Sequence, residues 1–115
     1  MTVSLDKFDK LNIVKLSGEL GYPELCSVSN VFVNIAGSKT NIIIIDMHGL
    51  NFISSVIIRE IVRAWQKLNN QGTKVLFIGL NKDIFEIFKL TGLTSLFNIE
   101  DITLEEAQQR LSTGK

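Results

Sequence analysis

The sequence predicts a small α/β domain in which one mixed sheet packs against helices. Four consecutive isoleucines occupy positions 42–45. Because successive side chains of a strand point to opposite faces, such a run predicts a central strand covered on both sides, as is usual for parallel strands connected by helices. Apolar residues recur at helical spacing on either side of this run, and strand-like and helical segments alternate along the chain. The length of 115 residues corresponds to one domain, residues 1–115.

The N-terminal half predicts two strands, one helix and the isoleucine strand. Residues 2–8 and 11–17 alternate weakly, and we expect two strands joined by a tight turn at 9–10, the second ending at Gly18. Pro23 suits the first turn of a helix, which should end at Gly37. Its predicted apolar stripe comprises Leu25, Val28, Val31, Phe32, Ile35 and Ala36. The strand over 41–46 follows, and we expect it to reach the surface at Asp46 and lead through a loop to Ser54.

The C-terminal half predicts three helices and one strand. The helix after Ser54 should turn five apolar residues inward: Ile58, Ile61, Val62, Trp65 and Leu68. Gly72 should end it before a buried strand over 75–79. Asn81 should start a short helix whose inner face is Ile84, Ile87, Phe88 and Leu90. Thr103 and Glu106 form a capping box for a last helix with Leu104, Ala107 and Leu111 inward. We interpret Glu100, Asp101, Glu105 and Glu106 as charges favoured near a helix start.

Composition excludes several classes of partner. The chain has 12 basic and 12 acidic residues, which argues against nucleic acid or an anionic membrane as the main partner. The N-terminus has no apolar signal-peptide core, and no segment approaches the roughly 20 apolar residues that span a bilayer, so we expect a cytoplasmic protein. Cys26 lacks a metal or redox partner in the sequence, and we expect it to be a small buried hydrophobic residue.

Catalysis requires converging groups, and the sequence offers few of them. His48 lies in the predicted loop and could in principle act as a base for Ser54 or Ser55, with Asp46 orienting it. However, no glycine-flanked nucleophile turn surrounds the serines. There is also no phosphate-binding glycine run and no metal-ligand spacing. We therefore expect no enzymatic activity and no cofactor.

The serine pair at the start of a helix is the candidate site. One serine should act as the N-cap, its hydroxyl accepting a first-turn N–H. The other should point outward, within reach of a kinase, and a phosphate there would be tolerated by the positive end of the helix. Val56 should lie on the exposed side with Glu60 and Arg63, where it would add an apolar contact to a docking patch.

Four segments follow the order and spacing of a known family: IVKLSGEL at 13–20, IIIIDMHGLNFIS at 42–54, NNQGTKVLFIGLN at 69–81 and IFKLTGLTSLFNIEDITLEEA at 87–107. Together they resemble STAS domains, which occur in bacterial anti-sigma-factor antagonists and in the cytoplasmic parts of sulphate transporters. The resemblance implies a STAS-like fold, a single mixed sheet of four to five strands packed with four to five helices. It also implies a non-enzymatic regulator that binds an anti-sigma factor with serine kinase activity and is reset by a phosphatase.

Matching on Phe52 and Gly72, the resemblance places the phosphorylated serine at Ser55, with Ser54 as the alternative. The partner-binding residues it suggests are Asp46, Ser54, Ser55, Val56 and Arg59.

The chain departs from the family pattern near this serine. Ser54 occupies the usual Asp position, and Gly21 the position of a second acid. Small and glycine positions of the family are filled here by Val56, Ile57 and Arg59. Two alternatives therefore stay open: a scaffold that uses the same surface without phosphorylation, and a nucleotide or lipid sensor with Asp46 and His48 as polar contacts. We expect a monomer or a weak dimer.

Overall fold

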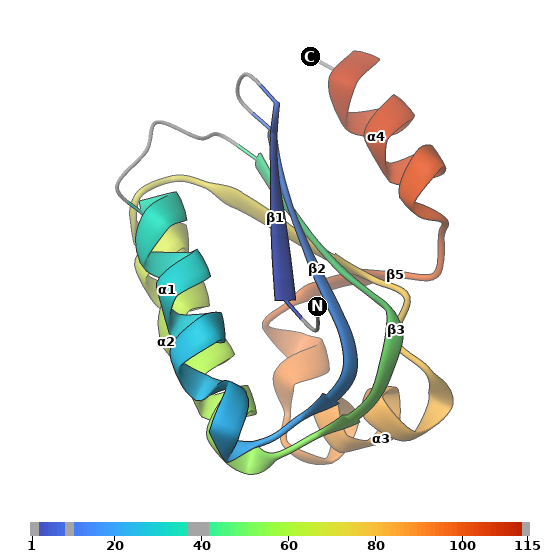
Figure 1. Cartoon of the computed structure of the whole chain (residues 1–115). Coiled ribbons are helices and arrows are strands. Elements are labelled where there is room, and N and C mark those ends of the chain that lie inside the picture. The colour runs from blue at the N-terminus through green and yellow to red at the C-terminus, as the bar shows by residue number, and fades with distance from the viewer. Residues whose placement is uncertain (1–2, 9–10, 37–41, 114–115) are drawn as a thin grey trace.

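The computed structural model describes residues 3–8, 11–36 and 42–113. Its single sheet has five strands in the spatial order β1-β2-β3-β4-β5, which is also their order in the chain (Figure 1). The strands are β1 (Val3–Phe8), β2 (Leu11–Leu20), β3 (Ile42–Ile53), β4 (Lys74–Ile78) and β5 (Asn98–Glu100). Strand β1 runs antiparallel to β2, and all other neighbours are parallel. The predicted single mixed sheet is confirmed.

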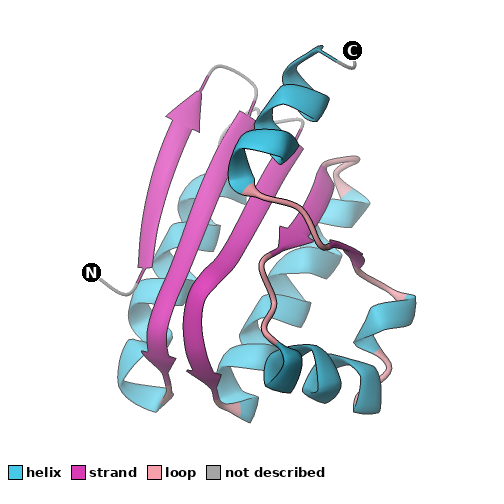
Figure 2. Ribbon diagram, turned by 90° about the vertical axis from the view of Figure 1, so that its right-hand side faces the viewer, coloured by secondary structure: helices cyan, strands magenta, loops and turns pink. Residues whose placement is uncertain are grey.

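Four α-helices and two short 3-10 helices complete the described fold. They are η1 (Tyr22–Glu24), α1 (Leu25–Ala36), α2 (Ser55–Asn70), α3 (Lys82–Leu90), η2 (Leu93–Ser95) and α4 (Leu104–Thr113). Helices α1, α2 and α3 each connect one parallel strand to the next, and each new strand joins the same edge of the growing sheet. Because such crossovers are right-handed, all three helices fall on one face of the sheet. The opposite face is left for α4, which lies across the front of the sheet in Figure 2.

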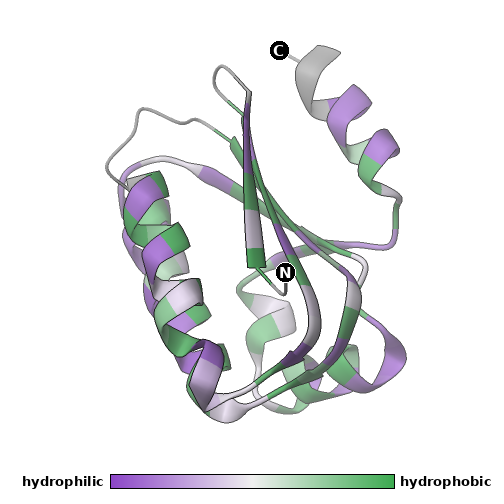
Figure 3. Cartoon of the chain, in the orientation of Figure 1, coloured by the Kyte–Doolittle hydropathy of each residue, from purple (hydrophilic) through white to green (hydrophobic). Residues whose placement is uncertain are grey.

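The isoleucine run of β3 is buried on both faces over Ile43–Ile45, as predicted. Ile43 and Ile45 belong to the large core formed with α1, α2 and α3. Ile44 points the other way and packs in a smaller cluster with Ile13, Leu76, Ile78 and Ala107 of α4. Figure 3 shows the matching pattern, with apolar and polar bands alternating along α1 and mostly apolar colour on the central strands.

Strands β2 and β3 are longer than predicted. β2 continues past Gly18 to Leu20, and β3 includes residues 47–53, which we expected to form a loop. The two extensions pair with each other through Glu19–Phe52 and Leu20–Ile53, with register irregularities near Gly18. Gly18 has a φ of 75°, a value that glycine adopts at little cost, so the strand accommodates the irregularity and continues.

The helix faces are rotated slightly from their predicted positions. The buried line of α2 is Ile57, Ile61, Ala64 and Leu68, and the predicted Ile58, Val62 and Trp65 flank it as half-buried residues. Leu90 was predicted to face inward but is 79% exposed, because it lies two positions, about 200° of helix, beyond the buried Phe88. Cys26 likewise lies two positions from a buried residue, Val28, and therefore points away from the core. It is exposed, so its predicted burial is wrong.

The C-terminal segment contains one strand that was not expected from the sequence. β5 has three residues and pairs with β4 through Ile78–Glu100. Glu100 was interpreted as a helix-start charge, but it lies in this strand and forms an ion pair with Arg110 of α4. The capping box is confirmed, since Thr103 and Glu106 exchange hydrogen bonds of 2.9 and 3.1 Å. The predicted turn at 9–10, Gly37, Asn41 and the side chains of Ala36 and Leu111 lie outside the described residues.

An aromatic cluster joins the segment after α3 to the large core. Phe97 stacks on Phe77 of β4 with ring centroids 4.3 Å apart and an interplanar angle of 11°. It also meets Phe88 at 5.8 Å and Trp65 at 5.3 Å. One buried ring thus fastens β4, α3 and α2 together.

We expect Phe97→Ala to lower the free energy of unfolding by about 3–5 kcal/mol, because it opens a cavity at the centre of this cluster. Urea denaturation followed by circular dichroism measures the change. The neighbouring Leu96 is 54% exposed, so Leu96→Ala is a matched control expected to change stability by less than about 0.5 kcal/mol. Equal losses in the two variants would contradict this account of the cluster.

Candidate functional site

The serine pair lies at the corner where β2 and β3 end together. The last register pair of the two strands is Leu20–Ile53, and the N–H of Ser54 donates a 2.9 Å hydrogen bond to the Leu20 carbonyl. Two chain segments then leave the sheet side by side, one into η1 and the other into α2. This corner lies at the bottom of Figure 1.

The η1 side of the corner is held by a carboxylate. Glu24 accepts a 2.7 Å hydrogen bond from the N–H of Gly21, and its own N–H donates to the Gly21 carbonyl at 3.0 Å. Pro23 stands in this short helix, so the predicted helix start at Pro23 takes the form of a 3-10 turn leading into α1. A carboxylate therefore lies at Gly21, and it is supplied by Glu24, three residues later in the chain.

Ser54 occupies the N-cap position of α2, but its hydroxyl makes no capping hydrogen bond. Its backbone is extended, with φ −89° and ψ 164°, and its carbonyl accepts from the N–H of Ile58 at 3.0 Å. Its Oγ is buried and has no hydrogen-bond partner among the described residues. The predicted capping hydrogen bond from a first-turn N–H is therefore absent at this serine, which leaves an unsatisfied polar atom beside the site.

Ser55 is the first residue of α2 and is exposed. The first turn contains no acidic residue, so no carboxylate of that turn offsets the positive end of this 16-residue helix. Arg59 is exposed one turn later, on the same side of the helix as Ser55. Val56 was expected to be exposed, but it is half-buried and packs against the large core, and Ile57 is fully buried. The bulky residues after Ser55 therefore face inward.

Two exposed aromatic residues flank the serine, and neither was among the predicted site residues. Phe52 is 52% exposed and precedes the buried Ile53 in β3, while Tyr22 is 74% exposed at the start of η1. They lie on the two segments that meet at the corner. Once β3 is known to extend to Ile53, strand alternation alone places Phe52 on the outer side. We call Tyr22, Phe52, Ser55 and Arg59 the docking corner.

Asp46 lies away from the docking corner. It is buried within β3, eight residues before Ser54, which corresponds to roughly 25 Å of extended strand. His48, expected in a loop, is also in β3, and its Nδ1 lies 2.6 Å from Oδ1 of Asp46. The same oxygen accepts the His48 backbone N–H at 3.0 Å. The expected orientation of His48 by Asp46 is thus present, but the pair does not adjoin the serines.

Gly79 forms the slot in which His48 lies. Its φ is +77°, and a Cβ added there would come within 2.5 Å of His48 Nδ1 and 2.6 Å of the His48 backbone nitrogen. Only a residue without a side chain allows the imidazole to lie against the end of β4 in this way. The described residues contain no group of three or more His, Cys, Asp or Glu side chains that could hold a metal ion.

The family model described as STAS domain matches residues 2–107. The chain belongs to the STAS domain family. No curated protein sequence matches it. Its five-stranded mixed sheet and four helices correspond to the STAS fold of its structural neighbours.

Solved structures confirm the fold of this STAS domain. It resembles an anti-sigma factor antagonist from Mycobacterium paratuberculosis, with TM-score 0.81, 19% identity, and coverage of 94% of this chain and 91% of the other. It also resembles the Bacillus cell fate determinant SpoIIAA in its phosphorylated form, with TM-score 0.80, 18% identity, and coverage of 95% and 98%. The STAS domain of a SulP transporter from Vibrio cholerae matches with TM-score 0.74, 20% identity, and coverage of 95% and 86%. None of the described helices of this STAS domain is long and apolar enough to span a membrane.

We expect Gly79→Ala to destabilise the STAS domain more than Gly72→Ala does. Both glycines have left-handed φ, which costs a side-chain-bearing residue about 1–2 kcal/mol, but nothing lies within 4 Å of a Cβ at Gly72. The overlap with His48 should add about 1–3 kcal/mol, which is the usual cost of overpacking. Urea denaturation of the two variants measures the difference. Equal losses would show that His48 can move aside freely.

Proposed function

We propose that this chain is a cytoplasmic, non-enzymatic regulatory protein of the anti-sigma-factor antagonist type. It binds an anti-sigma factor with serine kinase activity through the docking corner, and the kinase phosphorylates Ser55. The observation behind the proposal is the exposed Ser55 at the first position of a 16-residue helix, flanked by exposed Phe52 and Tyr22. Solved STAS structures of similar fold include anti-sigma factor antagonists and a phosphorylated SpoIIAA.

The chemistry of the docking corner suits a reversible protein contact. Exposed aromatic rings and arginine are the residue types most often found at the energetic centre of protein interfaces. Phe52, Tyr22 and Arg59 supply both types around the serine. A partner that covers Ser55 would therefore also bury the two rings.

Phosphorylation would act on the same contact. A phosphate on Ser55 adds nearly two negative charges, which the positive end of α2 and Arg59 tolerate within this domain. For a partner surface that packs on the two rings, however, the phosphate introduces a charge that must be desolvated or repelled. Phosphorylation should therefore release the partner without unfolding the domain, and removal of the phosphate by a phosphatase would restore binding.

Of the residues that depart from the family pattern after Ser55, Arg59 is exposed and the other two face mainly inward. Ile57 is buried and Val56 is half-buried, so their bulk adds to the core beneath the helix start. Glu24 brings a carboxylate to the backbone of Gly21, the position at which the family usually has an acidic residue. Ser54, in contrast, offers no charge, and its Oγ is buried. This observation favours a second candidate function, a scaffold that binds through the docking corner and is not phosphorylated.

We expect purified anti-sigma factor kinases of the source organism, given ATP, to add one phosphate to the native chain at Ser55. Intact-mass and peptide mass spectrometry identify the modified residue. Ser55→Ala should abolish the modification, whereas Ser95→Ala, which alters an exposed serine outside the docking corner, should leave it unchanged. A phosphate on Ser54 would support the alternative acceptor. No modification, with binding retained, would favour the scaffold.

We also expect Phe52→Ala to weaken binding of the kinase partner about tenfold, or about 1.4 kcal/mol, because it removes an aromatic contact beside Ser55. Isothermal titration calorimetry measures the change in Kd. Leu90→Ala is the control, since Leu90 is more exposed than Phe52 but lies at the end of α3. If Leu90→Ala weakened binding more than Phe52→Ala, the partner would use a different surface.

A further inference from the structure

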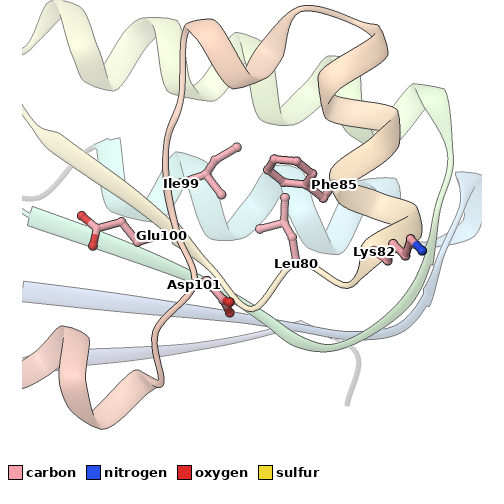
Figure 4. Close-up of a pocket in the computed structure, with 6 residues that line it drawn as sticks. All are labelled: Leu80, Lys82, Phe85, Ile99, Glu100 and Asp101. Carbon is pink, nitrogen blue, oxygen red and sulfur yellow. The ribbon is translucent and has the colours of Figure 1, made fainter.

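A second candidate site lies in a cavity of about 360 Å³ at the carboxyl ends of β4 and β5. Six residues line it (Figure 4): Leu80, Lys82, Phe85, Ile99, Glu100 and Asp101. Open α/β sheets bind small ligands beyond the carboxyl ends of their parallel strands, where this cavity lies. None of its lining residues belongs to the docking corner, and neither Asp46 nor His48 is among them.

One wall of the cavity is apolar and partly uncovered. Figure 4 shows Leu80, Phe85 and Ile99 grouped together. Leu80 and Ile99 are half-buried, and Phe85 is 41% exposed although it is among the largest apolar side chains. An exposed phenyl ring within a concave wall offers a surface on which a flat apolar group can pack.

Of the three charged residues that line the cavity, one cation and one anion are available to a ligand. Glu100 is already paired with Arg110 of α4. Lys82 and Asp101 remain, on different sides of the apolar wall (Figure 4), and neither forms an ion pair with the other or with any residue in the described part of the chain. A ligand with opposite charges at separate atoms would complement both residues.

Both walls are held in place without a ligand. The side chain of Asn81 accepts from the N–H of Ile84 at 2.8 Å and donates to the Leu50 carbonyl at 3.1 Å, which fixes the start of α3 against β3. On the other side, Glu100 is anchored by the pairing of β5 with β4 and by Arg110. The cavity is therefore preformed, as ligand sites usually are.

We propose that this cavity binds a small zwitterion with an aromatic side chain, of the aromatic α-amino acid class. The ligand's ring packs on Phe85, its carboxylate faces Lys82 and its ammonium group faces Asp101. A purely anionic ligand would leave the Asp101 carboxylate without a partner, and a neutral apolar ligand would desolvate Lys82 and Asp101 without replacing their water contacts. This binding is independent of phosphorylation at Ser55.

The test is a titration of the full chain, followed by ¹H–¹⁵N NMR, with three matched compounds. They are L-phenylalanine, L-phenylalaninamide, which lacks the carboxylate, and 3-phenylpropionate, which lacks the amine. A ligand of this size with three contacts should bind with a Kd of about 1 mM. We expect saturable shifts at Leu80, Phe85 and Ile99 for L-phenylalanine and at least fivefold weaker binding of both analogues.

Charge-neutralising variants separate the two polar contacts. Lys82→Gln should weaken L-phenylalanine severalfold but leave phenylalaninamide unchanged, because the amide has no carboxylate to lose. Asp101→Asn should weaken L-phenylalanine but leave 3-phenylpropionate unchanged. Lys89→Gln, an exposed change on α3 outside the cavity lining, should alter nothing. Equal affinity for all three compounds, shifts at other residues, or no saturable shift at about ten times the expected Kd would overturn the proposal.

Discussion

The burial of the isoleucine run of β3 on both of its faces is the constraint on which the rest of the structure depends. Ile43 and Ile45 require a helical layer on one side, and Ile44 requires cover on the other. Three right-handed crossovers supply the first layer, because each new parallel strand is added in the same direction. They cannot cover the second face, so α4 must return across it. Its capping box at Thr103 and its ion pair between Arg110 and Glu100 help to fix that return.

The same strand also separates the functional features of the molecule. At its far end, pairing with β2 as far as Leu20–Ile53 delivers Ser55 and Phe52 to the docking corner. In its middle, Asp46 and His48 lie against Gly79 at the end of β4. The cavity beyond β4 and β5 is a third location. One sheet thus carries both the proposed docking corner and the proposed ligand cavity, and the two share no residue.

The serine corner belongs to a STAS fold but departs from the family pattern in its side chains. The backbone of the corner is set by strand pairing and by the start of α2, which tolerate many side chains. In this chain the Ser54 hydroxyl is buried and has no hydrogen-bond partner in the described part of the structure, and the carboxylate at Gly21 comes from Glu24. The exposed residues that remain are two aromatic rings, an arginine and a serine. The rings and the arginine are residue types that are common at the centre of protein interfaces, and His48 lies elsewhere on β3.

The sequence by itself determined the elements whose signal is local: the isoleucine strand, the amphipathic α2, the Asn81 and Thr103 helix starts, and the serine pair at a helix N-terminus. Local periodicity is sufficient there because each pattern lies within one element. Tertiary structure alone decided the extension of β3 through 47–53, the three-residue β5, the exposure of Cys26 and the partial burial of Val56. These outcomes depend on which strand or helix lies alongside, since a strand is continued by its neighbour's hydrogen bonds and a helix buries the side that its neighbours cover. For the same reason Asp46, close to the serines in sequence, lies far from them along an extended strand.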